Sequence, residues 1–329
     1  EAILEEVLEG HRKRAIASEV ADLAWGIAQG KREFLELPDA LQMVLAENYR
    51  VKETPIEFVT DDLEELYNTT YGKPGLRWRL KTLRCMMGSL RKGDFGFLFA
   101  RPEVGKTTFI ANQVGYFASQ SERPILHFNN EEFGNKVKLR YYQAALGLTT
   151  RELFNDFSGN RRLYSDISRN HIKLIDRAVF SKADCEDIIA RVNPELIVFD
   201  SIDKLTGFKE SKEDTVDTKY KVIYQWAREL AKAYGPVIGV CHASASGEGK
   251  KYLEMDDVAY AKTAKQGEAD WILGIGKSHD PMDDGRRFLH LCKNKLLGDE
   301  DTHEELRHGR LPVKLYADIA QYDDEVEID

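Results

Sequence analysis

The residues Gly105, Lys106 and Thr107 have the types and the order that bind a phosphate group. They complete the second half of the phosphate-binding motif G-x-x-x-x-G-K-[ST]. In such a loop, backbone N–H groups and the N-terminus of the next helix attract phosphate oxygens. The lysine adds a full charge beside the β- and γ-phosphates, and the hydroxyl can ligate Mg²⁺. The residues predicted to hold a nucleotide are Ala100, Arg101, Pro102, Glu103, Val104, Gly105, Lys106, Thr107 and Thr108.

The elements on either side of this motif decide between a nucleotide loop and an ordinary strand-to-helix turn. Ala100 stands where the motif has its first glycine, which weakens the motif taken alone. Residues 95–99 form a short apolar run that predicts a buried strand, and residues 106–111 begin an apolar pattern at helical spacing. Strand, loop and helix follow in the order that the motif requires, so the nucleotide loop is favoured over the turn.

Two carboxylates follow apolar runs that predict further strands. Glu131 comes shortly after residues 124–128, where a carboxylate could activate a water molecule against a γ-phosphate. A solvated loop acid would look the same in isolation. Asp200 ends the run 195–200, and an aspartate there can hold Mg²⁺ through water beside the Thr107 hydroxyl.

A histidine and a group of lysines follow in the next part of the chain. His242 ends the run 236–242, and we expect it either to sense loss of the γ-phosphate or to be a hydrogen-bonded histidine at the core edge. The polar insert after it carries lysines among small residues, which suits contacts with a phosphodiester backbone, although such a cluster can also be a solvated face. These lysines are Lys250, Lys251, Lys262 and Lys265, and farther on Lys293 and Lys295 share one side of a predicted strand.

The chain divides into four predicted parts. Residues 1–60 have apolar positions at helical spacing and predict a small helical region, either a packing element or lid, or a docking surface for a neighbouring subunit or partner. Residues 61–76 are polar and rich in turn residues, so we expect a linker. Residues 77–320 predict an α/β domain, and residues 321–329 an acidic tail that is disordered from Asp323 onward. Further strands are expected at residues 269–273 and 288–292, with an edge strand at 313–319.

Composition limits the class of protein. The chain has 329 residues, of which 42% are hydrophobic and 31% charged, which is enough for a large α/β core and a small appendage. Its four scattered cysteines support neither a zinc site nor a disulfide framework, so reduced thiols in the cytoplasm are expected. We expect no membrane span and no signal peptide, and the missing initiator methionine predicts a fragment. A net charge of −9 argues against coating nucleic acid with the whole surface.

Residues 75–320 resemble the ATPase domain of DnaB-type hexameric replicative helicases, and in particular the helicase half of phage primase-helicases. The resemblance rests on residues 88–94, on residues 100–102 and on residues 105–108, and the family often has alanine at the first motif position. It implies a RecA-like P-loop fold with a central, mostly parallel sheet. It also implies ATP and Mg²⁺ as ligands, single-stranded DNA as a partner, assembly into a ring (a hexamer in the family), a primase or polymerase partner, and a bacterial or phage-infected cytoplasm.

The resemblance also implies roles for single residues. Glu131 corresponds to the family's catalytic glutamate, Asp200 to its Mg²⁺-associated aspartate, and His242 to the residue that ends the next strand. The family's Lys-x-Arg pair, which reaches the neighbouring subunit's ATP, reads Lys293-Asn294-Lys295 here, and lysine cannot make the planar, bidentate contact of arginine. The family's DNA loop precedes Ala-Asp, which here would include Lys262 and Lys265. Two alternatives remain: a recombination or repair ATPase, and a non-catalytic DNA-binding or scaffold component with a vestigial ATP site.

Overall fold

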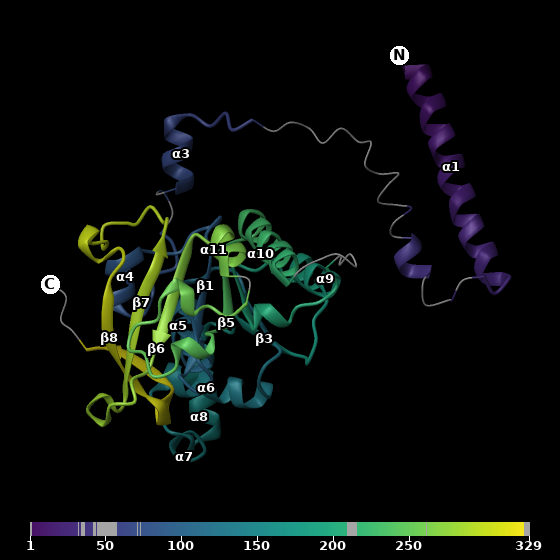
Figure 1. Ribbon diagram of the computed structural model, residues 1–329. Helices are drawn as coiled ribbons and strands as arrows, with labels where there is room; N and C mark the ends of the chain where they lie inside the picture. Colours follow the sequence, from purple (N-terminus) through teal and green to yellow (C-terminus); the bar gives the residue numbers. More distant parts are fainter. Residues whose placement is uncertain are drawn as a thin grey trace. The chain divides into compact units, whose positions relative to one another are not determined.

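A computed structural model describes residues 2–31, 33, 37–41, 44, 58–70, 72, 74–208, 216–260 and 262–325 (Figure 1). The chain divides into two compact units, residues 1–66 and 67–329. In the first unit, helix α1 (Ala2–Ala28) is rich in alanine, leucine and glutamate, which favour helix, and it confirms helical structure there. The helical pattern predicted between Phe34 and Leu45 lies mostly outside the described residues.

A helix forms inside the predicted linker. Helix α3 (Leu63–Thr70) begins after Asp62, whose carboxylate accepts a hydrogen bond from the Glu65 N–H at 2.9 Å. The Glu65 carboxylate in turn accepts from the Asp62 N–H at 3.1 Å. These reciprocal bonds satisfy two N–H groups at the helix start. The turn residues that suggested a linker therefore lie mainly after the helix.

The second unit contains a nine-stranded sheet in the order β3-β2-β4-β5-β1-β6-β7-β8-β9. The first six strands in this order, from β3 across to β6, pair in parallel. Strands β7, β8 and β9 then add antiparallel pairs. The mostly parallel sheet confirms the predicted α/β class. The strands are β1 (Phe95–Ala100), β2 (Ile125–Asn129), β3 (Ile172–Asp176), β4 (Leu196–Asp200), β5 (Val237–His242), β6 (Trp271–Gly276), β7 (Arg286–Asn294), β8 (Arg310–Tyr316) and β9 (Gln321–Asp324).

Helices cover both faces of this sheet, and two apolar cores result. Alternation along β1 sends Phe97 and Phe99 into one core and Leu98 into the other. The Leu98 core also contains residues of α5 and α6, whereas the Phe97 core contains residues of α9 and α10. The helices of this unit are α4 (Lys81–Met87), α5 (Lys106–Gln120), α6 (Gly134–Leu146), α7 (Thr150–Leu153), α8 (Phe157–Ser168), α9 (Lys182–Val192), α10 (Val216–Ala233) and α11 (Lys262–Glu268).

The strand order places the polar strand ends at one edge of the sheet. Strand β5 lies between β4 and β1, and Ala100 pairs with His242 in the parallel register. Asn129 at the end of β2 pairs with Asp200 at the end of β4. In an open α/β sheet, ligands bind at this carboxyl edge, where the strand order reverses. The predicted phosphate loop, carboxylates and histidine therefore emerge together.

The end of the chain differs from the sequence-based expectation. The predicted edge strand at residues 313–319 is wrong, because β8 ends at Tyr316 and pairs with β7 on one side and β9 on the other. Asp323 and Asp324 were expected to be disordered, but they belong to β9, which forms the edge. Residues 326–329 of the predicted tail lie outside the described residues. Among the described helices, none is long and apolar enough to cross a membrane.

Candidate nucleotide-binding site

The phosphate loop joins the end of β1 to the start of α5. Gly105 immediately precedes the helix and has a φ of 110°, in the left-handed region that favours glycine. A Cβ atom at this position would lie 2.6 Å from the Tyr322 hydroxyl. Both the backbone angle and the close approach therefore require glycine at the position that the motif also reserves for it.

Two carbonyl groups of the loop accept hydrogen bonds from distant strands, from residues that the sequence did not indicate. The buried Tyr322 hydroxyl of β9 donates to the Gly105 carbonyl at 3.2 Å, and Nε of Arg287 in β7 donates to the Val104 carbonyl at 2.6 Å. Because these two hydrogen bonds fix the Val104 and Gly105 carbonyls, the loop has a defined shape. No local pattern in the sequence predicts partners so far along the chain.

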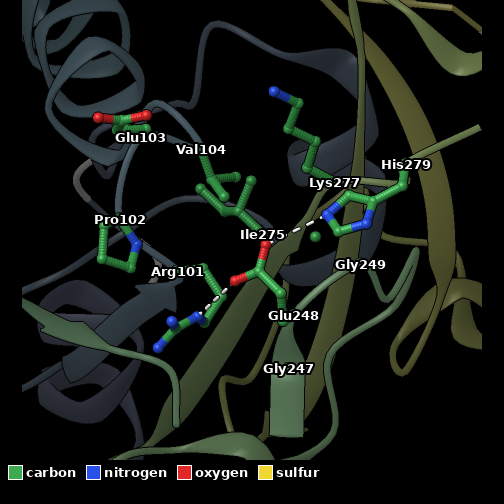
Figure 2. Close-up of a pocket in the computed structure, with 11 residues that line it drawn as sticks. Arg101, Pro102, Glu103, Val104, Gly247, Glu248, Gly249, Ile275, Lys277 and His279 are labelled. Carbon is green, nitrogen blue, oxygen red and sulfur yellow. Dashed lines mark hydrogen bonds and ion pairs between the residues drawn. The ribbon is translucent and has the colours of Figure 1, made fainter. Parts of the chain in front are cut away.

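The start of the loop is tied to the insert that follows β5. Nε of Arg101 lies 2.8 Å from Oε2 of Glu248, and Oε1 of Glu248 lies 3.2 Å from Nε2 of His279 (Figure 2). These three side chains border a cavity of about 120 Å³. Its other lining residues are Pro102, Glu103, Val104, Gly247, Gly249, Ile275, Gly276 and Lys277. The cavity lies at the first half of the loop, away from the carboxylates that are predicted to act in catalysis.

Lys106 is the first residue of α5, and its side chain is buried. Burial lowers the pKa of its ammonium, while the nearby Glu131 and Asp200 carboxylates raise it. Its ammonium donates a long hydrogen bond of 3.5 Å to the Arg101 carbonyl. A buried cation between two carboxylates and a loop is suited to neutralise a polyanionic phosphate chain.

Thr107 and Asp200, the two residues predicted to hold a metal ion, contact each other. The Thr107 hydroxyl donates to Oδ2 of Asp200 at 3.0 Å, and Asp200 is only 1% exposed. Oδ1 of Asp200 is buried and has no hydrogen-bond partner. Burial, followed by the charge of Glu131, raises the pKa of Asp200 to about 6. An orphaned carboxylate oxygen beside a hydroxyl fits a small hard cation such as Mg²⁺, which binds through few protein oxygens and keeps several waters. The described residues contain no cluster of three or more His, Cys, Asp or Glu side chains that could hold a metal ion.

Glu131 and His242 meet at the same edge. Oε1 of Glu131 lies 3.1 Å from Nε2 of His242, and both side chains are partly exposed. The hydrogen bond from His242 lowers the pKa of Glu131 against the opposing effect of burial. The neighbouring acid, Glu132, instead pairs with Arg140 of α6. Of the two acids, Glu131 is thus the one that faces Lys106 and the end of β5.

Asn130 connects the tips of β2 and β4. Its Nδ2 donates to the Ser201 carbonyl at 3.1 Å, and its Oδ1 accepts from the Ser201 N–H at 2.6 Å. Its own N–H donates to the Asp200 carbonyl at 2.9 Å. These bonds fix Glu131, the next residue, relative to Asp200. This role could not be predicted from the sequence, because an asparagine after a strand is common in turns.

The lysines predicted to bind DNA do not form one exposed cluster. Lys265 is fully buried, and its Nζ lies 2.7 Å from Asp203, so its prediction as a DNA contact is wrong for this conformation. The other three lie at the surface but already have partners: Lys250 pairs with Asp257 at 2.8 Å, Lys251 pairs with Asp283 at 2.8 Å, and Lys262 donates to the Asp256 carbonyl.

The two lysines of β7 and its end differ from each other. Lys293 is partly buried and donates to the Gln266 carbonyl, and burial, followed by the charge of Lys295, lowers its pKa. Lys295 is exposed. Lys295 is therefore the better placed of the two to reach another molecule.

Comparisons with known proteins agree with this geometry. A curated relative, the replicative DNA helicase DnaB of Buchnera aphidicola subsp. Baizongia pistaciae (strain Bp), is 29% identical over 145 residues, which cover 39% of this chain and 31% of the relative. The chain thus spans about a third of that relative's length. A solved DnaB-like replicative helicase, described together with its interactions with primase, has 16% identity and a TM-score of 0.67, over 98% of this chain and 78% of that chain.

A second solved structure, an ATPase domain, has 16% identity and a TM-score of 0.59, over 88% of this chain and 98% of that chain. At such identity these two likenesses show the fold alone, and it is the RecA-like fold that the sequence predicted. Residues 60–248, which are more than half of the chain, match the family model described as an AAA domain. The chain therefore belongs to the AAA domain family.

Proposed function

We propose that this chain is the motor part of a DnaB-type replicative DNA helicase, which couples ATP hydrolysis to translocation on single-stranded DNA and to unwinding of the duplex. One observation carries the proposal. Lys106, the Thr107–Asp200 pair and the Glu131–His242 pair converge at the carboxyl edge of a single sheet. The curated relative is a replicative helicase, which supports the choice of motor.

The geometry suggests how ATP would be hydrolysed. Glu131 orients the attacking water and accepts its proton, because its lowered pKa keeps it ionised at neutral pH. Lys106 neutralises charge that develops on the γ-phosphate oxygens. Thr107 and Asp200 would hold Mg²⁺, which adds positive charge beside the β- and γ-phosphates when it is bound. His242, in contact with Glu131, is placed to respond to the γ-phosphate and to pass the change to the residues that follow β5.

We propose a homo-oligomeric ring, a hexamer as in the family, in which Lys295 and Lys293 reach the nucleotide of the neighbouring subunit. An apolar groove between α6, α7 and α8 is suited to hold such copies together. Its volume is about 630 Å³, and Phe154 and Phe157 are exposed along it, with Lys136 and Arg161 at its border. A soluble protein rarely exposes such a patch without a partner.

The occupant that we assign to this groove is α3 of a second copy. Leu63 of α3 is 84% exposed, and Phe58 and Val59 just before it are also exposed. The first turn carries Glu64 and Glu65, whose negative charge complements the basic border of the groove. Helix-in-groove docking uses this combination of apolar anchors and a charged rim.

Sizing in the presence of Mg²⁺ and a non-hydrolysable ATP analogue tests the assembly. Leu63→Asp and Phe157→Asp should each shift the protein to monomers, whereas Val179→Asp, a change at another exposed apolar residue, should not. Oligomers that withstand both substitutions would contradict α3 as the occupant. If Lys295→Ala still forms rings and hydrolyses ATP at the parent rate, Lys295 does not act on the nucleotide of the neighbouring subunit.

The function itself is tested by ATP hydrolysis with and without single-stranded DNA, and by unwinding of a forked duplex. We expect DNA to stimulate hydrolysis, and Lys106→Ala to abolish both activities. Strand exchange without unwinding would favour the recombination ATPase, and absence of hydrolysis would favour the vestigial site. A primase or polymerase partner and a cytoplasmic location belong to the same proposal, since the solved DnaB-like helicase is described with primase.

A further inference from the structure

Tyr260 is an exposed aromatic side chain just before α11. It is 65% exposed, yet its ring is not isolated. It lies against the ring of Tyr220 in α10, with ring centroids 6.1 Å apart and an angle of 18° between the planes. One face of the Tyr260 ring is therefore backed by a second ring, and most of its remaining surface is open.

The backbone at Tyr260 is held in an unfavourable conformation. Its φ is 52°, in the left-handed region that costs energy for a residue other than glycine. The preceding carbonyl, of Ala259, accepts a hydrogen bond from the Lys265 ammonium at 2.9 Å. Such a conformation persists only where its surroundings hold it, and this bond is one restraint that does so.

Lys265 is itself part of a buried cluster. Its ammonium pairs with Asp203 at 2.7 Å and lies 4.3 Å from the centroid of the Tyr220 ring. The same buried cation thus fixes the backbone beside Tyr260 and the ring behind it. Tyr260 is a rigid aromatic platform rather than a loose surface side chain.

The surroundings of Tyr260 suit one kind of ligand. Lys262 begins α11 two residues after Tyr260, and its side chain is exposed. Exposed aromatic rings near lysines are the usual means by which proteins grip single strands: a base stacks on the ring, and the cations attract the phosphates. A duplex offers no unstacked base to such a ring.

We infer that Tyr260 is a binding site for a base of single-stranded DNA, which stacks on the open face of its ring. This inference rests on the proposed function and adds a contact that reads the presence of a base rather than a phosphate. Lys265 was predicted to contact DNA but is buried, so we assign the contact with the DNA strand to Tyr260 instead.

The site also has a short connection to the proposed catalytic groups. The Ala259 N–H donates to the His242 carbonyl at 3.0 Å, and Val258 pairs with Ala243 in an antiparallel bridge. The His242 ring in turn contacts Glu131. A DNA strand bound to Tyr260 would therefore act on the Ala259 backbone, which is hydrogen-bonded to His242, the residue that contacts Glu131.

The test compares two probes that share phosphates but not bases: an oligothymidylate and an abasic oligonucleotide of the same length. Binding is measured by fluorescence anisotropy with Mg²⁺ and a non-hydrolysable ATP analogue. Tyr260→Ala should weaken binding of the oligothymidylate by about tenfold and leave the abasic strand unchanged. Tyr260→Phe and Tyr260→Trp should retain tight binding, and Tyr116→Ala, a change at an exposed tyrosine of α5, serves as the matched control.

A second readout is the stimulation of ATP hydrolysis by DNA: the oligothymidylate should stimulate hydrolysis by the parent and fail to stimulate it in Tyr260→Ala. Equal binding of the oligothymidylate by Tyr260→Ala and the parent would overturn the inference but leave the proposed helicase intact. Equal weakening for both probes, or a change of oligomer size on sizing, would also overturn it, in favour of a phosphate contact or a protein interface. A parent protein that binds neither probe would remove the proposed function, and the inference with it.

Discussion

Nε2 of His242 lies 3.1 Å from Oε1 of Glu131, so the tip of β5 is bonded to the residue proposed as the catalytic base at the end of β2. The bond has two consequences. It lowers the pKa of Glu131, and it fixes the carboxylate beside Lys106 and Asp200. Any movement of β5 or of the segment after it therefore changes both the orientation and the basicity of Glu131.

Glu131→Gln should keep ATP binding and lose hydrolysis by about 10²- to 10⁴-fold, because the amide cannot accept the proton of the attacking water. Hydrolysis is measured by phosphate release, and binding by a fluorescent ATP analogue. Glu132→Gln is the matched control, since the neighbouring acid pairs with Arg140 and should be nearly neutral for hydrolysis. Parent-rate hydrolysis in Glu131→Gln would remove the central assignment.

His242→Ala should move the acidic limb of the pH profile of hydrolysis to higher pH. The hydrogen bond from His242 lowers the pKa of Glu131, so its loss leaves more of the carboxylate protonated, and inactive as a base, on the acidic side. The profile of kcat/KM is measured for the parent and the variant, with His303→Ala as a control at a distant histidine. An acidic limb that stays in place would show that His242 does not set the basicity of Glu131.

The sequence could predict which residues gather at the carboxyl edge of the sheet, because this edge is made of local patterns. Apolar runs define β1, β2, β4 and β5, three of which end in a polar residue, and parallel strands bring their ends together at one edge of the sheet. Strand β3 was not predicted, since Lys173 interrupts its apolar run. The missed residues act at long range: Tyr322 reaches the phosphate loop from the end of the chain.

Lys265 shows the same limit in another way. A lysine near small polar residues is expected at the surface, and the sequence offers no sign that Asp203, 62 residues earlier, will meet it in the interior. Burial of a paired charge is a property of the assembled fold. Local patterns therefore identified the residues at strand ends, whereas contacts that hold loops and rings in place required the structure.

Asp200→Asn should stabilise the metal-free protein at neutral pH while it abolishes hydrolysis. Burial raises the pKa of Asp200 from 3.8 to about 6, so the ionised carboxylate opposes folding. The cost is absent below pH 3.8, the pKa of the unfolded chain, and it grows as the pH rises from 3.8 to about 6. Above pH 6 it is complete and amounts to at most about 3 kcal/mol.

Urea unfolding in the presence of a chelator measures this effect. The gain in the free energy of unfolding should be full at neutral pH and should vanish below the ordinary pKa of an aspartate. Asp217→Asn, a change at an exposed acid in α10, should produce no such gain. A variant that is less stable than the parent at neutral pH would show that the carboxylate is favourably solvated or paired.

A chain that ends at Ala320 should be less stable by at least about 3 kcal/mol, because it lacks the buried Tyr322 ring. It also lacks the Asp324 carboxylate, which accepts from the Lys81 and Thr82 N–H groups at 2.7 and 2.9 Å. Nucleotide binding should weaken too, since Tyr322 holds the Gly105 carbonyl. A chain that ends at Glu325 keeps all of β9 and is the control. Equal melting temperatures for both chains would contradict a structural role for β9.

Subunits with Lys295→Ala and subunits with Glu131→Gln should each hydrolyse ATP slowly, yet a mixture of the two should recover activity. The exposed Lys295 is proposed to act on the neighbour's nucleotide, so an interface between the two variants can combine an intact Glu131 with an intact Lys295. If Lys295 acted on its own subunit's nucleotide, every site in the mixture would lack one of the two groups and no activity would return. Phosphate release across mixing ratios, with nucleotide and DNA saturating, distinguishes these outcomes, and an activity maximum at intermediate ratios is expected only for action between subunits.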